Sequence, residues 1–134
     1  MRLVALLSIV GIAACQLKLP AAPSELTEGV VIYQDADYLG ASAHVTKDVS
    51  NLQDYAGPCQ QDFEDYSTKS WAFCISSIRV APGWRATIYD RTNYRGQFLN
   101  VVEDTPNLVL VNGDCRKGGL NDCIVSIRVS RLTP

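Results

Sequence analysis

The chain has 134 residues, a net charge of −2 at pH 7 and a pI of about 5.2. This length fits a single domain with a modest hydrophobic core. The mildly acidic balance argues against nucleic-acid binding, which requires a basic face.

The N-terminal residues 1–15 have the pattern of a secretory signal peptide. Arg2 precedes an apolar run from Leu3 to Ala14, and Ala13-Ala14-Cys15 supplies small residues for cleavage. The run is too short to span a bilayer. We therefore predict a secreted, extracellular protein. Two alternatives stay open: a buried or interfacial N-terminal helix, and a lipid anchor on Cys15.

Residues 16–28, which contain Pro20 and Pro23, are predicted to form a flexible leader before the domain at 29–134. Gly29–Tyr33 is rich in β-branched residues and predicts the first strand. The turn-rich segment Asp35–Gly40 follows it, and the alternating segment Ser42–Thr46 predicts the second strand.

Val49–Tyr55 leads into a third strand region, and Ile75–Val80 predicts the fourth strand. In this strand, Ile78 and Val80 are expected to face the core, with Ser77 and Arg79 pointing outward. The acidic segment Gly57–Trp71 lies between these two regions. It is interpreted either as a solvated loop or as a recognition loop, because binding residues concentrate on loops.

The second half repeats this plan after a linker at Pro82-Gly83. Its predicted strands and strand regions are Arg85–Tyr89, Gln97–Val102, Leu108–Val111 and Ile124–Val129. Strands that recur every 8–12 residues between turn signals predict an all-β sandwich. Trp71 and Trp84 are expected to pack in the core or at its edge.

The two halves are related by an internal repeat. Cys74–Val80 and Cys123–Val129 agree at six of seven positions, and Ile32–Gly40 aligns with Ile88–Gly96 at an offset of 56. A match this dense indicates that a whole structural unit is duplicated. We assign motif one to residues 29–81 and motif two to residues 84–132.

The landmarks of each copy resemble the Greek-key motif of the βγ-crystallin superfamily. That motif joins an aromatic–four residues–aromatic–any–glycine hairpin to a downstream serine. The matching residues here are Tyr33, Tyr38, Gly40 and Ser77 in motif one, and Tyr89, Tyr94, Gly96 and Ser126 in motif two. The resemblance implies one βγ-crystallin-like sandwich of two Greek-key motifs, in which the hairpin packs against the serine.

Cysteine counting also favours export. Without Cys15, four cysteines remain in a small domain, and four cysteines allow three disulfide connectivities. The repeat favours Cys59–Cys74 and Cys115–Cys123, because Cys74 and Cys123 are equivalent and each has one partner earlier in its own copy. A zinc site is disfavoured because the chain has no Cys-x-x-Cys and only one histidine, His44.

Many domains of the family that this chain resembles bind two calcium ions. Their ligands come from Asn/Asp-Asn/Asp-x-x-Ser/Thr-Ser around the downstream serine, and the two motifs share them. By this resemblance, the Asp122 carboxylate with Asn121, the Ser76 hydroxyl and the Ala36 carbonyl are expected to form one metal site. The alternative interpretation is that Asn121-Asp122 forms a tight turn and binds no metal ion.

The second calcium site that the resemblance implies is expected to be lost in this chain. Phe73 replaces an acidic residue and Val125 replaces a ligating hydroxyl, so only the Thr92 carbonyl could serve there. We therefore predict one weak calcium site, with an affinity on the order of 10⁻⁵ to 10⁻³ M.

No catalytic set is apparent. His44 is the only possible general base of a serine triad, and no nucleophile-elbow glycines surround any serine. We predict a non-enzymatic, monomeric protein with a structural or protective role. The resemblance also admits two alternatives that would act through the 57–71 loop. These are a killer-toxin-like or antimicrobial protein and a metalloprotease inhibitor.

Overall fold

The computed structural model describes residues 25–60, 69–113, 115 and 119–134. The predicted signal peptide, Cys15, most of the leader and the centre of the 57–71 loop lie outside the described residues. Among those residues, no helix is long and apolar enough to cross a membrane.

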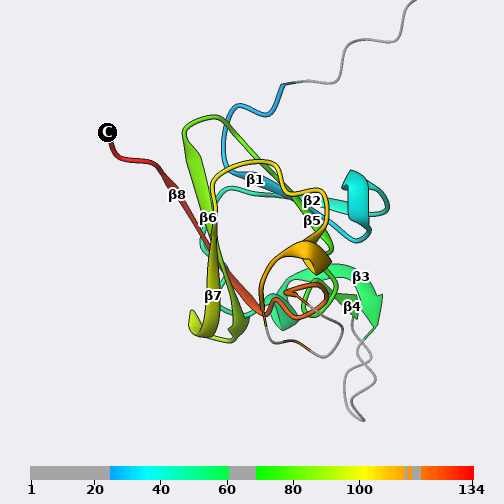
Figure 1. Ribbon diagram of the computed structural model, residues 1–134. Helices are drawn as coiled ribbons and strands as arrows, with labels where there is room; N and C mark the ends of the chain where they lie inside the picture. The colour runs from blue at the N-terminus through cyan, green and yellow to red at the C-terminus, as the bar shows by residue number, and fades with distance from the viewer. Residues whose placement is uncertain (1–24, 61–68, 114, 116–118) are drawn as a thin grey trace, which may run out of the picture.

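The described chain is built from short strands and three single turns of 3-10 helix (Figure 1). The first half contains β1 (Val30–Tyr33), η1 (Ala36–Tyr38), β2 (Ser42–Val45), η2 (Leu52–Asp54), β3 (Ala56–Gln60), β4 (Lys69–Ser70) and β5 (Ser77–Val80). The second half contains β6 (Trp84–Arg91), β7 (Arg95–Val101), η3 (Leu108–Leu110) and β8 (Ser126–Arg131).

Two antiparallel sheets with equivalent strand orders form the body of the domain. One has the order β2-β1-β5 and the other has the order β7-β6-β8. The first sheet comes from motif one and the second from motif two, as the repeat requires. Figure 1 shows β1, β2 and β5 on the right, opposite β6, β7 and β8 on the left.

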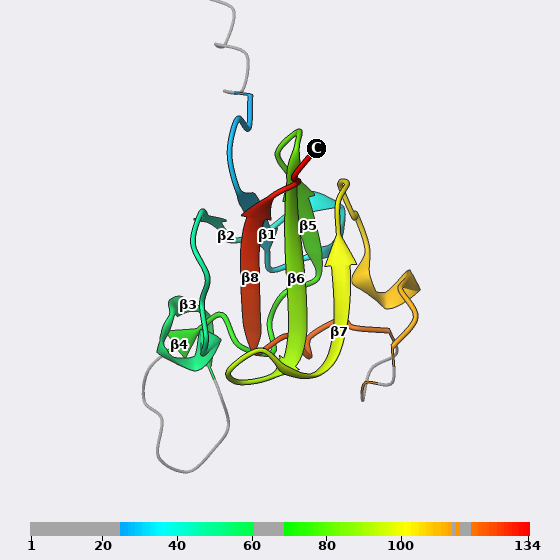
Figure 2. The same ribbon diagram turned by 90° about the vertical axis from the view of Figure 1, so that its left-hand side faces the viewer.

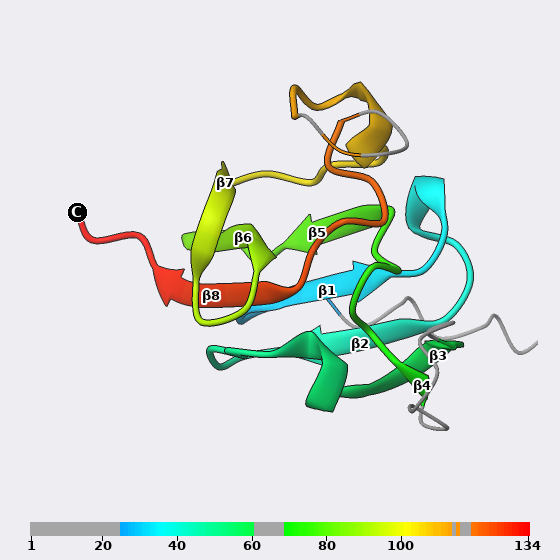
Figure 3. The ribbon, with the colours of Figure 1, turned by 90° about the horizontal axis from the view of Figure 1, so that it is seen from below.

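The two motifs exchange chain segments. A bridge joins Val49, from motif one, to Ile127 in β8, and the equivalent bridge joins Thr105 to Ile78 in β5. Each three-stranded sheet is therefore extended at its edge by a short segment of the other motif. Seen from below (Figure 3), η2 with β3 and β4 lies on one side of the domain, and η3 lies on the opposite side.

The core lies between the sheets and follows the period-2 alternation of the strands. Ile32 on β1, Ile78 on β5, Ile88 on β6 and Ile127 on β8 are all fully buried. Apolar residues of the connecting segments close the ends of this core: Leu52, Trp71, Ile75, Leu108, Leu120 and Ile124. Trp71 is buried, as expected, whereas Trp84 is half-buried beneath the guanidinium of Arg131.

Three local expectations need correction. The ends of the predicted Gly57–Trp71 loop lie in strands, because Ala56–Gln60 pairs with Lys69–Ser70 as the small sheet β3-β4. Leu108–Val111 is not a strand, because Asn107 accepts a hydrogen bond from the backbone N–H of Val109 and starts the turn η3. Ser77 lies on the face of β5 opposite the core but is fully buried, unlike its exposed neighbour Arg79. The hairpin β1–β2 folds over Ser77 and excludes water from it.

Each folded hairpin is tied to its sheet by the buried serine. The Ser77 hydroxyl donates to the Asp35 carbonyl at 2.6 Å and accepts from the Tyr38 N–H at 3.0 Å. In motif two, the Ser126 hydroxyl donates to the Arg91 carbonyl at 2.6 Å and accepts from the Tyr94 N–H at 3.1 Å. These bonds satisfy hairpin backbone groups that the sheet cannot reach.

The hairpin tyrosines form the same ring contacts in both copies. Tyr33 and Tyr38 meet edge to face with centroids 5.7 Å apart, and Tyr89 and Tyr94 do so at 5.9 Å. The Arg79 guanidinium lies 4.4 Å from the centre of the Tyr38 ring. Burial is the largest of the effects that raise the pKa of the Tyr38 phenol above its ordinary value; the Asp104 charge adds to it.

Replacing either buried serine is expected to destabilise the domain. Ser77→Ala and Ser126→Ala each leave a buried N–H and a carbonyl without their partner, which costs about 1–3 kcal/mol in the free energy of unfolding. Urea denaturation followed by tryptophan fluorescence measures this loss. Ser42→Ala, at an exposed strand position, is the matched control and is expected to change stability by less than about 0.5 kcal/mol. Equal stability of all three variants would contradict this role of the serines.

Two disulfides join the pairs that the repeat favours. Cys59 bonds to Cys74 with their Cα atoms 6.1 Å apart, and Cys115 bonds to Cys123 with their Cα atoms 6.3 Å apart. Cys59 lies in β3, so the first disulfide fixes the small sheet β3-β4 to the buried residue Cys74. In each copy, one bridge holds the segment that precedes the last strand.

Removing the longer bridge is expected to cost more stability. The two bridges span sequence separations of 15 and 8 residues. In the chain-entropy model, losing them lowers the free energy of unfolding by about 3 and about 2.5 kcal/mol, respectively. Thermal unfolding of the paired Cys→Ala variants tests this order. A larger loss for Cys115→Ala/Cys123→Ala would show that packing outweighs chain entropy.

Candidate metal site

The structure brings two of the predicted metal ligands together from different motifs. The Ser76 hydroxyl donates to Oδ1 of Asp122 at 3.4 Å, although the residues are 46 positions apart in sequence. Ser76 is buried and Asp122 is half-buried. A buried hydroxyl and a carboxylate that converge across the motif interface are oxygen ligands of the type that hard cations prefer.

Backbone hydrogen bonds hold these two residues in place. The Ser76 N–H donates to the Tyr33 carbonyl at the end of β1, and the Asp122 N–H donates to the Ile75 carbonyl. The Leu108 N–H, from motif two, donates to the Ser76 carbonyl at 3.0 Å. The segment before β5 is therefore fixed on both sides by the backbone of other elements.

The Asp122 carboxylate is further oriented by its neighbour. The Asn121 side-chain amide donates to Oδ2 of Asp122 at 3.0 Å, so one carboxylate oxygen faces Asn121 and the other faces Ser76. Asp122 has a φ of 55°, in the left-handed region that aspartate tolerates better than most residues. In this arrangement Asn121 positions the carboxylate through its nitrogen, which is a donor and not a metal ligand.

Ala36 lies in the hairpin turn η1, which Ser77 holds against β5. The Ser77 hydroxyl binds the carbonyl of Asp35, the residue before Ala36, and Ser76 precedes Ser77 in the chain. The Ala36 carbonyl accepts one hydrogen bond, from the Leu39 N–H at 3.3 Å, and a carbonyl oxygen has two lone pairs. The turn is also fixed by the Asp37 N–H, which donates to the Pro106 carbonyl of motif two.

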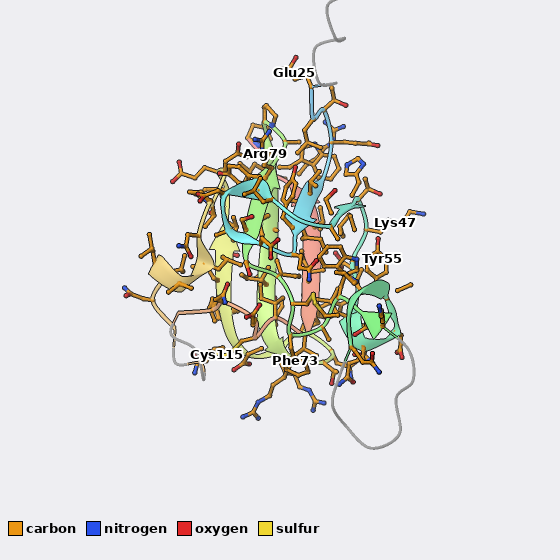
Figure 4. The ribbon with its side chains drawn as sticks, turned by 90° about the vertical axis from the view of Figure 1, so that its right-hand side faces the viewer. Glu25, Lys47, Tyr55, Phe73, Arg79 and Cys115 are labelled. Atoms are coloured by element: carbon orange, nitrogen blue, oxygen red, sulfur yellow. A yellow bond between two sulfur atoms is a disulfide. The ribbon has the colours of Figure 1, made fainter. Side chains whose placement is uncertain are left out.

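The equivalent positions on the other side have the same backbone but different chemistry. The Phe73 N–H donates to the Ile124 carbonyl at 3.0 Å, as the Asp122 N–H does to Ile75, and Phe73 has a φ of 58°. The Phe73 and Val125 side chains offer no oxygen. Thr92 would contribute only its carbonyl, so these residues do not fit a metal ion. Figure 4 labels Phe73 toward the end of the domain opposite Arg79.

The described residues give little support to a different metal site or to a catalytic site. No group of three or more His, Cys, Asp or Glu residues is gathered there in a way that could hold a metal ion. The four cysteines of the domain are bonded to one another. His44 is exposed, and its Nε2 lies 2.7 Å from the Glu28 carbonyl. The recognition-loop prediction falls largely on residues 61–68, outside the described residues.

Sequence reasoning missed a role for two aspartates that join the motifs. Asp48 accepts from the Val129 N–H of β8 at 2.8 Å, and Asp104 accepts from the Val80 N–H of β5 at 2.8 Å. Each carboxylate thus accepts a backbone hydrogen bond that a further strand would otherwise accept, at the edge of the other motif's sheet. Their shared offset of 56 was the signal that could have identified them.

Comparisons with known proteins support the fold. No protein-family model and no curated protein matches the sequence. A structure from work on the evolution of the eye-lens βγ-crystallin domain fold has a TM-score of 0.62 at 22% identity, covering 84% of this chain and 95% of that one.

Two further βγ-crystallin structures have a TM-score of 0.53. A domain from Flavobacterium johnsoniae is 24% identical and covers 76% of this chain and 93% of its own. A protein from Ciona intestinalis is 18% identical, with coverages of 75% and 96%. The predicted fold class, an all-β sandwich of two βγ-crystallin-like Greek-key motifs, is confirmed.

Proposed function

We propose that this domain of βγ-crystallin fold is a secreted, non-enzymatic protein that binds one calcium ion and serves a structural or protective role. The observation that carries the proposal is the 3.4 Å approach of the Ser76 hydroxyl to the Asp122 carboxylate. These two oxygens come from different motifs, so an ion bound between them would link the two halves.

The donor set favours calcium over other metals. Asp122 would supply a carboxylate, Ser76 a hydroxyl and Ala36 a carbonyl, with Asn121 orienting the carboxylate; calcium takes such mixed oxygen ligands. A single carboxylate makes a weakly charged site, with an affinity on the order of 10⁻⁵ to 10⁻³ M. Binding to the folded state alone would add about 2.7 kcal/mol of stability at a concentration 100 times Kd.

The disulfides support the extracellular part of the proposal. Two bridges join four cysteines of a small domain, and such bridges persist in oxidising compartments. A secreted protein also meets calcium concentrations that fill weak sites of this kind. The predicted signal peptide at residues 1–15 fits this location.

Calorimetric titration with calcium is expected to give a stoichiometry near one. Asp122→Asn and Ser76→Ala should both abolish the heat of binding, because each removes one of the two converging side-chain ligands. Phe73→Ala and Val125→Ala, at the equivalent positions of the other motif, are the matched controls and should bind as the unchanged protein does. Absence of both heat and thermal stabilisation at millimolar calcium in the unchanged protein would refute the proposal.

The lost second site should be recoverable. The double variant Phe73→Asp/Val125→Ser restores a carboxylate and a hydroxyl where the backbone already matches that of Asp122 and Ser76. The stoichiometry is then expected to rise from one to two, because the Thr92 carbonyl completes the equivalent set. Phe73→Asn/Val125→Ser, which lacks the charge, serves as the control. A stoichiometry that stays at one in a folded double variant would show that the two sides differ in backbone as well.

A further inference from the structure

The outer face of the β7-β6-β8 sheet is hollowed by a pocket of about 400 Å³. Figure 2 looks directly onto this face. Six of its lining residues carry the argument: Arg85, Thr87, Tyr89, Phe98, Asn100 and Arg128. The volume falls in the range of small-molecule sites.

The sheet register brings these side chains into neighbouring rows. Thr87 pairs with Asn100 on β7 and with Arg128 on β8, so the three side chains cross the sheet together. Tyr89, two residues after Thr87 on β6, pairs with Phe98 on β7 and forms the neighbouring row. Since the backbone groups here are used by the sheet, a ligand would be recognised by side chains.

Two arginines give the pocket its positive charge. Nη2 of Arg85 lies 3.5 Å from the Ser130 hydroxyl, while its Nε is buried and has no hydrogen-bond partner among the described residues. A buried N–H without a partner is costly and points to a missing acceptor. The Arg128 guanidinium is held 4.2 Å from the centre of the Tyr94 ring. A guanidinium group suits a carboxylate, which accepts two parallel hydrogen bonds from it.

The remaining wall combines polar and aromatic groups. The Thr87 hydroxyl donates to the Asn100 amide oxygen at 2.7 Å, leaving the amide nitrogen to face a ligand. The Tyr89 and Phe98 rings have centroids 6.0 Å apart, and 62% of Phe98 is exposed to solvent. Hydroxyl and amide groups beside an exposed ring match a molecule that carries hydroxyls on an otherwise apolar ring.

Motif one has the same fold without most of these pocket side chains, so the fold does not require them. Motif one has Gly29, Val31, Ser42 and His44 where motif two has Arg85, Thr87, Phe98 and Asn100. Of the six residues, only Tyr89 and Arg128 are kept in motif one, as Tyr33 and Arg79. Charge follows the same division, since residues 84–132 hold seven Lys/Arg and five Asp/Glu, whereas residues 29–81 hold three and seven. The pocket is therefore a specialisation of motif two.

We propose that this pocket binds an acidic sugar, namely a uronate residue of a glycan. Arg85 and Arg128 bind the carboxylate, Thr87 and Asn100 bind ring hydroxyls, and Phe98 packs on the apolar face of the ring. Asp48 lines the rim, where its Oδ1 already accepts the Val129 N–H. Its charge disfavours a second carboxylate at that end and favours a sugar hydroxyl.

The test is calorimetric titration of the oxidised protein with tetragalacturonate in the presence of EDTA, so that it does not depend on the proposed calcium site. Measurable binding is expected, with Kd raised at least tenfold by Arg85→Gln or Arg128→Gln. Arg79→Gln, the motif-one equivalent of Arg128→Gln with the same change in charge, should shift Kd less than twofold. Unchanged thermal midpoints would establish that the variants are folded.

Two comparison probes decide the ligand class. The methyl ester of the same oligosaccharide, which lacks the charge, should bind at least tenfold more weakly, and a tetraglutamate peptide should also bind more weakly. Absence of uronide binding, an equal loss in Arg79→Gln, ester binding as tight as that of the acid, or tighter binding of the peptide would each overturn the proposal.

Discussion

In each half of the molecule, one fully buried serine hydroxyl joins the folded hairpin to the last strand of its own motif. Ser77 and Ser126 each bind a carbonyl and an N–H of the hairpin turn. A larger side chain would not fit beneath the turn, and a smaller one would leave both groups without a partner. These bonds fold the hairpin over the sheet and hold the turn that contains Ala36 against β5.

The second constraint is the exchange between motifs. Ile78 bridges to Thr105 and Ile127 bridges to Val49, so each sheet is extended at its edge by a segment of the other motif. The apolar faces then close on one shared core. This arrangement brings Ser76 and Asp122 together, and the proposed ion site consequently exists only when both motifs are folded and docked.

Duplication has left two motifs with equivalent sheets and hairpin turns, on which the side chains have diverged. Phe73 and Asp122 share a left-handed backbone conformation and equivalent hydrogen bonds, yet only Asp122 carries a carboxylate. On the outer faces, Val31 and His44 of motif one correspond to Thr87 and Asn100, which help to line the pocket of motif two. Residues that are the same in both motifs are therefore those that the fold requires, whereas residues that differ can belong to a site in one motif.

The sequence by itself determined the repeat, the hairpin landmarks and the all-β class, because these depend on local patterns and their spacing. It also indicated which residues could pair across the motifs. Only the tertiary structure decided the burial of Ser77, the turn at Leu108 and the pocket around Arg85. Those features depend on which segment covers a strand face and on cross-strand register, and both are set by contacts between residues far apart in the chain.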